Sequence, residues 1–274
     1  MAISLDSPVY NELFPYFLSD SLFWVILFSS MFYLMPFAMT KLLPKYYNKF
    51  PDKKKADFIS YICSFVHHVV VVPQAVYRMI FLTANATSAI GPFFSTYNES
   101  VLNEGSAMLL HCEAAPFSFG YLAADIFFYA IPEALQGRYE YIIHHMLGLC
   151  LFVIVPLLPV DVAPFCSRVL IMESTSICFT ISYILRNTGN EKSIFVPIFE
   201  IAFVIVFFLI RVLNLVYLMY EVVQMMVLGS SNRDTQIFGM IITGVFVPIL
   251  AMQLYWFGII VKKSFERFNA RKLQ

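Results

Sequence analysis

Seven stretches of this chain are apolar for long enough to cross a lipid bilayer as helices. One crossing takes about 20 mainly apolar residues, and the chain is 59% hydrophobic and only 13% charged. The stretches are continuous rather than alternating, which favours helices over the strands of a barrel. We therefore predict an all-α polytopic membrane protein, a seven-helix bundle with spans at 14–39, 57–82, 117–135, 141–159, 163–185, 197–223 and 237–261.

The spans divide the chain into three parts. Residues 1–49 hold an N-terminal segment, the first transmembrane helix and the start of a basic loop; residues 50–262 form a six-helix membrane domain; residues 263–274 form a basic tail. The stretch from Ile194 to Leu228 would be about 50 Å long as a helix. This length exceeds a straight crossing, so we expect the helix to tilt, kink or protrude.

Lysine and arginine gather in three connections that seven spans place on one side of the membrane: the loop at residues 41–55, the loop after the fifth span, and the tail. The positive-inside rule makes this side cytosolic and the N-terminus lumenal. Asn85 and Asn98 begin glycosylation sequons in a loop predicted to be lumenal. We therefore expect a multi-pass glycoprotein of the endoplasmic reticulum membrane. The formal net charge is zero, which indicates no nucleic-acid partner.

Two histidine pairs, His67-His68 and His144-His145, lie inside predicted spans. An ionisable side chain at mid-bilayer costs about 2.5–3.5 kcal/mol on insertion scales, so membrane helices keep one where it is paired or functional. Adjacent residues on a helix point about 100° apart, so we expect one histidine of each pair to lead and the other to support it.

Other polar residues recur every three or four positions in several spans and so share helix faces. Such faces turn toward one another rather than toward lipid, which predicts a polar interior cavity. Arg211 should meet Glu173 or Asp125 there, because an unpaired charge is too costly. Our candidate catalytic residues are His144, His145, Glu173, His67, His68 and Asp125, and our candidate binding residues are Arg211, Tyr121, Ser176 and Gln74.

Several motifs follow one another in the predicted helices: a histidine at 67 or 68, Gly120-Tyr121-Leu122 with Asp125, His144-His145, Glu173-Ser174-Thr175-Ser176, and Phe207-Phe208-Leu209-Ile210-Arg211. Their order resembles the TLC domain family, named for TRAM, Lag1 and CLN8, over roughly residues 50–262. That family includes ceramide synthases, which join an acyl-CoA to a sphingoid base. The ceramide synthase signature continues with a downstream His-Asp and a second Asp that this chain lacks, so it is more similar to the TLC-domain-containing subgroup.

The resemblance and the expected cavity together favour a protein of lipid homeostasis, including sphingolipid homeostasis. Its partner would be a membrane lipid such as a sphingoid base or ceramide, held by its headgroup. The alternative is an acyl-CoA-dependent N-acyltransferase with a histidine general base and acyl-CoA as co-substrate. We expect no resident cofactor or metal, because no HxxH or HxxxH spacing supports proton or metal transport. A bond between Cys112 and Cys166 stays open.

Overall fold

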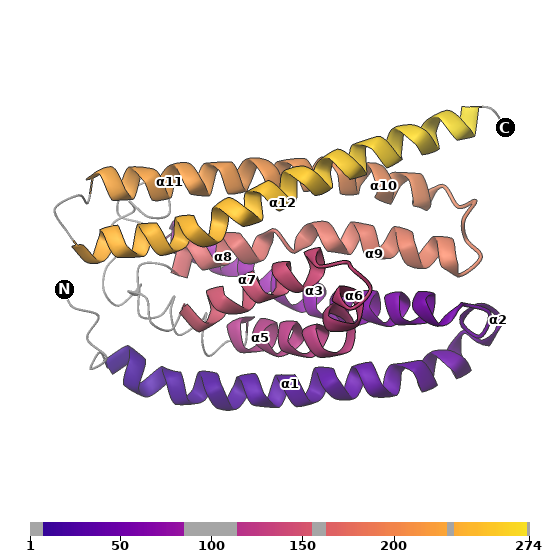
Figure 1. Ribbon diagram of the computed structural model, residues 1–274, viewed down its shortest axis with the longest axis horizontal. Helices are drawn as coiled ribbons and strands as arrows, with labels where there is room; N and C mark the ends of the chain where they lie inside the picture. The colour runs from indigo at the N-terminus through magenta and orange to yellow at the C-terminus, as the bar shows by residue number, and fades with distance from the viewer. Residues whose placement is uncertain (1–7, 85–113, 155–162, 229–232, 273–274) are drawn as a thin grey trace.

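The computed structural model describes residues 8–84, 114–154, 163–228 and 233–272, and all the secondary structure in them is helical. The long helices run side by side as one bundle (Figure 1). The elements are α1 (Pro8–Leu42), α2 (Pro44–Tyr47), α3 (Asp52–Ala84), α5 (Ala114–Asp125), η1 (Ile126–Ala130), α6 (Ile131–Ala134), α7 (Glu140–Ile154), α8 (Ala163–Ile171), α9 (Ser174–Asn187), α10 (Phe195–Val206), η4 (Phe207–Leu213), α11 (Asn214–Leu228) and α12 (Arg233–Lys272).

Six helical segments in the described residues are long and apolar enough to cross a membrane: Pro15–Leu42, Asp52–Ile80, Ala114–Ala134, Ser167–Asn187, Phe195–Gln224 and Gly239–Glu266. They match six of the predicted spans. The remaining prediction, 141–159, corresponds to α7, whose 15 described residues are too few for a crossing. The predicted end of that span, the two sequon asparagines, Cys112 and the side chain of Cys166 lie outside the described residues.

The three basic segments come together at one end of the bundle. Figure 1 shows α2, the α9–α10 connection and the end of α12 on the same side, while α1 begins at the opposite end. We call the end that carries these segments the basic end. Lys41, Lys192 and Lys262 belong to it through α1, the α9–α10 connection and α12. The predicted gathering of lysine and arginine on one side is therefore present in the fold.

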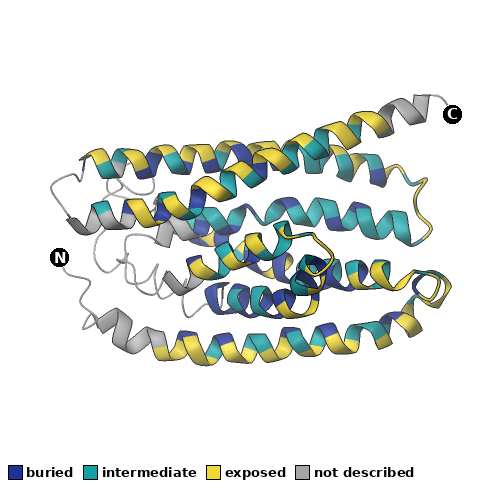
Figure 2. Cartoon of the chain, viewed as in Figure 1, coloured by how far each residue is buried: buried dark blue, intermediate teal, exposed yellow. Residues whose placement is uncertain are grey.

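Apolar side chains cover the outside of the bundle as well as its inside. Figure 2 shows exposed residues along the outward side of α1 and along α12, with buried residues where helices meet. Leu22, Phe23 and Tyr255 are each more than half exposed. Contiguous apolar surface of this kind suits lipid rather than water. Inside, Phe28 of α1 packs edge-on against Phe117 of α5, with ring centroids 5.1 Å apart.

Irregular turns interrupt three of the long helices. Two are π-helical segments, η1 after Asp125 and η4 around Arg211. The third lies within the predicted fifth span, where α8 ends at Ile171 and α9 begins only at Ser174. The long stretch from Ile194 to Leu228 contains η4 as its irregularity. Single π-helical turns are rare and occur often at functional sites, and all three interruptions lie next to residues of the site described below.

Candidate functional site

A cavity of about 640 Å³ lies among α3, α5, α7, α9, η4 and α12. This volume is in the range of small-molecule sites, about 300–1,000 Å³. Both histidine pairs and both acids lie around this one cavity, although the sequence predicted only one histidine of each pair there. The predicted site residues that line it are His67, His68, Tyr121, Asp125, His144, His145, Glu173, Ser176 and Arg211.

Gln74 is the predicted binding residue that does not line the cavity. It lies six residues after His68, which is about 9 Å further along α3 and away from the basic end. The stripe argument considered only the helix face and not the depth along the helix. Its Oε1 atom is buried without a hydrogen-bond partner among the described residues, and we find no part for it in the cavity.

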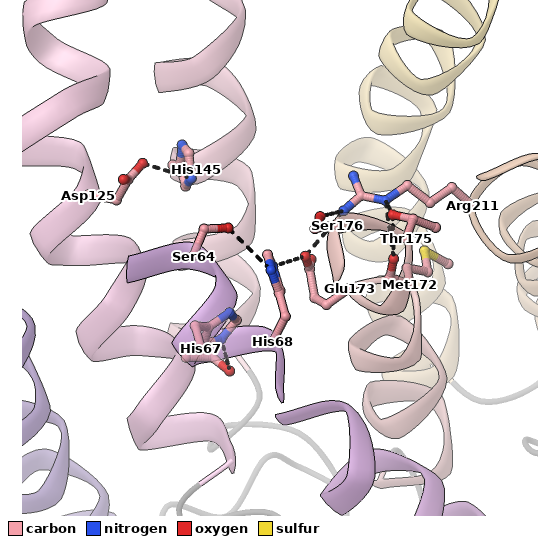
Figure 3. Close-up of polar contacts among 11 residues, drawn as sticks. Ser64, His67, His68, Asp125, His145, Met172, Glu173, Thr175, Ser176 and Arg211 are labelled. Atoms are coloured by element: carbon pink, nitrogen blue, oxygen red, sulfur yellow. Dashed lines mark hydrogen bonds and ion pairs between the residues drawn. The ribbon is translucent and has the colours of Figure 1, made fainter. Parts of the chain in front are cut away.

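His68 contacts one acid and one hydroxyl (Figure 3). Its Nε2 lies 2.8 Å from Oε2 of Glu173, and its Nδ1 lies 3.2 Å from Oγ of Ser64. A carboxylate only accepts hydrogen bonds, so Nε2 carries the ring proton. Nδ1 then offers a lone pair, to which the Ser64 hydroxyl donates. A neutral imidazole satisfies both contacts.

Arg211 holds Glu173 in place and confirms the predicted ion pair. Its Nη2 lies 3.1 Å from Oε2 of Glu173 and donates to Oγ of Ser176 at 3.3 Å. Its Nε donates to Oγ1 of Thr175 at 2.7 Å and to the carbonyl of Met172 at 3.2 Å. The break between α8 and α9 makes this carbonyl available, because it has left the regular helical pattern. Three of the four residues in the Glu-Ser-Thr-Ser motif therefore accept hydrogen bonds from Arg211.

His145 and Asp125 form the second pair. Nε2 of His145 lies 3.2 Å from Oδ2 of Asp125, and Nδ1 lies 2.9 Å from the carbonyl of Tyr141. The Ser60 hydroxyl donates to the other oxygen of Asp125 at 2.9 Å. A backbone carbonyl accepts only, so Nδ1 is protonated. The contact with Asp125 then needs a second proton, and the pair holds one proton more than a neutral imidazole beside a carboxylate.

The other two histidines contact side chains other than the acids. His67 lies 3.0 Å from Oγ of Ser118 through Nε2, and its ring stacks on Tyr121 with centroids 4.4 Å apart. The Tyr121 ring stands between the pairs, 6.2 Å from the ring of His68 and 6.3 Å from that of His145. His144 packs edge-on against Trp256 at 5.3 Å.

The cavity continues toward the basic end. We call this part the mouth; aromatic side chains line its inner part, and charged side chains line its outer part. Tyr61 and Tyr183 line it in edge contact at 4.5 Å. Arg186 and Glu200, paired at 3.1 Å, and Lys263 line its outer part. The charged part of the cavity lining therefore lies toward the basic end.

Our sequence reasoning missed many cavity-lining side chains, and four of them show what could and could not be found. One had a readable signal on α3: Tyr61 lies three residues before Ser64 and so belongs to the stripe already recognised. Another had one on α12, where Gln253 is the only amide of predicted span 237–261. The other two are Tyr183 and Trp256, and only their packing against α3 and α7 reveals them.

The chemistry open to this site is hydrogen bonding and proton exchange with a polar group. In the described part of the chain, no group of three or more histidine, cysteine or acidic side chains is arranged to hold a metal ion. Each histidine–acid pair is largely buried in the bundle, where electrostatic contacts are strengthened. The two pairs differ, because one is neutral at its histidine and the other carries an extra proton.

Comparison with known proteins supports the resemblance seen in the motifs. A search of curated proteins finds none that matches this chain. The TLC domain pattern matches residues 57–262, about three quarters of the sequence. The match includes both histidine pairs, both paired acids and Arg211, and it excludes α1. The chain therefore belongs to the TLC domain family.

Proposed function

We propose that this protein acts in lipid homeostasis in the endoplasmic reticulum membrane by binding a lipid headgroup in the cavity. The family is generally linked to lipid and sphingolipid metabolism. The observation that carries the proposal is the pair of histidine–acid contacts inside a cavity of membrane-spanning helices. Buried polar groups need partners; Nδ1 of His144, which lines the cavity, has none among the described residues, and a headgroup could supply one.

The charges of the site indicate the kind of headgroup it favours. Glu173 is compensated by Arg211, and Asp125 shares an extra proton with His145. Both pairs are therefore close to neutral overall. A neutral or zwitterionic headgroup rich in hydroxyl or amine donors fits this balance better than a strongly anionic one. Ceramide belongs to this class, and a sphingoid base joins it when its amine is deprotonated.

The proposal includes a topology of seven passes, with α7 and the residues after it as the fourth crossing. In support, α1 begins at one end of the bundle and α12 ends at the other (Figure 1), as an odd number of crossings requires. The positive-inside rule places the basic end in the cytosol. We also propose that the chain is closer to the TLC-domain-containing subgroup than to ceramide synthases, because it lacks their downstream His-Asp motif.

The test is co-purification of lipid with the full-length protein. Wild type, His145→Ala and the control Tyr255→Ala are purified in a maltoside detergent, and bound lipids are identified by mass spectrometry. Tyr255 is 64% exposed on the outer surface and does not line the cavity. We expect the control to retain the wild-type lipid and His145→Ala to lose it. Identical lipid on all three proteins would refute headgroup binding at this site.

A second candidate function is acyl transfer from an acyl-CoA to an amine or hydroxyl of the bound lipid. The observation favouring it is the state of His68, whose N–H is held by Glu173 while its lone pair faces a hydroxyl. This is the arrangement of a general base oriented by an acid. Arg186 and Lys263 at the mouth suit the phosphates of acyl-CoA. The assay is product formation from palmitoyl-CoA and a sphingoid base, which His68→Gln should abolish.

A further inference from the structure

Ser64 completes a sequence of three side chains that resembles an activated nucleophile. Its Oγ lies 3.2 Å from Nδ1 of His68, whose Nε2 lies 2.8 Å from Glu173. Glu173 is in turn anchored by Arg211 at 3.1 Å. A hydroxyl, a base within hydrogen-bond reach and a third group that orients the base are the structural signs of nucleophilic catalysis. Figure 3 shows the three side chains in this order.

The hydroxyl groups of the neighbouring serines donate to acceptors other than a histidine. Ser60 donates to Asp125, and Ser182 donates to the carbonyl of Phe179. Ser118 also touches a histidine, but its proton goes to the carbonyl of Ala114 at 2.6 Å. Ser118 therefore accepts from His67 and is not activated by it.

Ser64 has the opposite role, because the protonated nitrogen of His68 already faces Glu173. The Ser64 hydroxyl therefore donates to the unprotonated Nδ1 of His68. Ser64 also lines the cavity, so its oxygen is within reach of a bound lipid.

We propose that Ser64 is a nucleophile that carries an acyl group as an ester. This inference rests on the acyl-transfer candidate and adds a covalent intermediate to it. Ser64 Oγ attacks the carbonyl carbon of a long-chain acyl thioester and gives its proton to Nδ1 of His68. The C–S bond breaks, and the departing thiolate takes that proton and leaves as a thiol.

The second half-reaction returns the serine. An amine or hydroxyl of the acceptor lipid attacks the ester carbonyl and gives its proton to His68. The bond to Ser64 Oγ breaks, and the serine oxygen takes the proton back. The acyl group is now an amide or ester of the acceptor, and no oxidant or reductant is needed.

The experiment uses an alkyl fluorophosphonate, which phosphonylates activated serine hydroxyls, on the full-length protein in maltoside detergent. Peptide mapping by mass spectrometry should place the label on Ser64. We expect His68→Gln to slow labelling about 10²- to 10⁴-fold, the usual contribution of a general base. Ser182→Ala is the matched control, since it removes a hydroxyl of the same cavity that faces no histidine, and it should label like wild type.

A second measurement keeps the test independent of folding. After incubation with palmitoyl-CoA, Ser64→Cys should carry an acyl thioester that neutral hydroxylamine releases, while the wild-type ester resists it. Labelling absent from Ser64, or equal in His68→Gln, would overturn the inference. Acyl transfer that persists in Ser64→Ala would also overturn it but leave the acyl-transfer candidate intact. Headgroup binding is tested separately, by whether His145→Ala loses the bound lipid.

Discussion

Replacing Arg211 with alanine should destabilise the protein by about 3 kcal/mol. Breaking a buried ion pair by removing one partner costs about 3–5 kcal/mol, because the other charge is left uncompensated. Arg211 is 6% exposed and makes contacts to Met172, Glu173, Thr175 and Ser176. We expect the lower end of the range, since Glu173 is 25% exposed and keeps its contact with His68.

The assay is thermal unfolding in detergent, followed by tryptophan fluorescence. A loss of 1 kcal/mol lowers Tm by about 2–4 °C in domains of 150–250 residues, so Arg211→Ala should lower Tm by about 6–12 °C. Adding Glu173→Gln should recover about 1–3 kcal/mol as coupling between neighbours. Lys55→Ala is the control, because Lys55 pairs with a fully exposed Asp52 and such pairs contribute about 0–1 kcal/mol. An unchanged Tm in Arg211→Ala would refute a stabilising role for the buried ion pair of Arg211 with Glu173.

Three further predictions concern packing, chemistry and topology. Gly120→Leu should cost about 1–3 kcal/mol by overpacking, measured as Tm, because even a Cβ there would clash with Trp24 of α1; a stable variant would contradict the close approach. Asp125→Asn should lower lipid binding or product at least tenfold with unchanged expression, since an amide cannot share the extra proton of His145, and a wild-type level would contradict that proton assignment. Asn85→Gln and Asn98→Gln together should abolish a glycosidase-sensitive mass shift, and a protein that never carries this shift would contradict the lumenal loop.

The amino-acid sequence was enough to predict an all-helical membrane protein and many of the polar side chains that line the cavity. Apolar length alone identifies six of the seven predicted spans as helices long enough to cross, because a bilayer demands a similar length from each. The cost of charge in hydrocarbon singles out both histidine pairs, Asp125, Glu173 and Arg211, since such residues persist where they have partners. Helical periodicity predicts a shared polar interior but leaves open which histidine of each pair leads, and the structure brings all of these residues to one cavity.

Only the tertiary structure decided which residue meets which. Periodicity assigns a helix face but neither the depth of Gln74 nor the contact of Tyr183 with α3. It also treats helices as continuous, so it missed the break at Glu173, which orients the Met172 carbonyl toward Arg211. Which histidine meets which acid depends on the distances between side chains of separate helices. His68 lies within hydrogen-bond distance of Glu173, and His145 within hydrogen-bond distance of Asp125. Such distances follow from how helices pack, and packing is set by side chains far apart in the sequence.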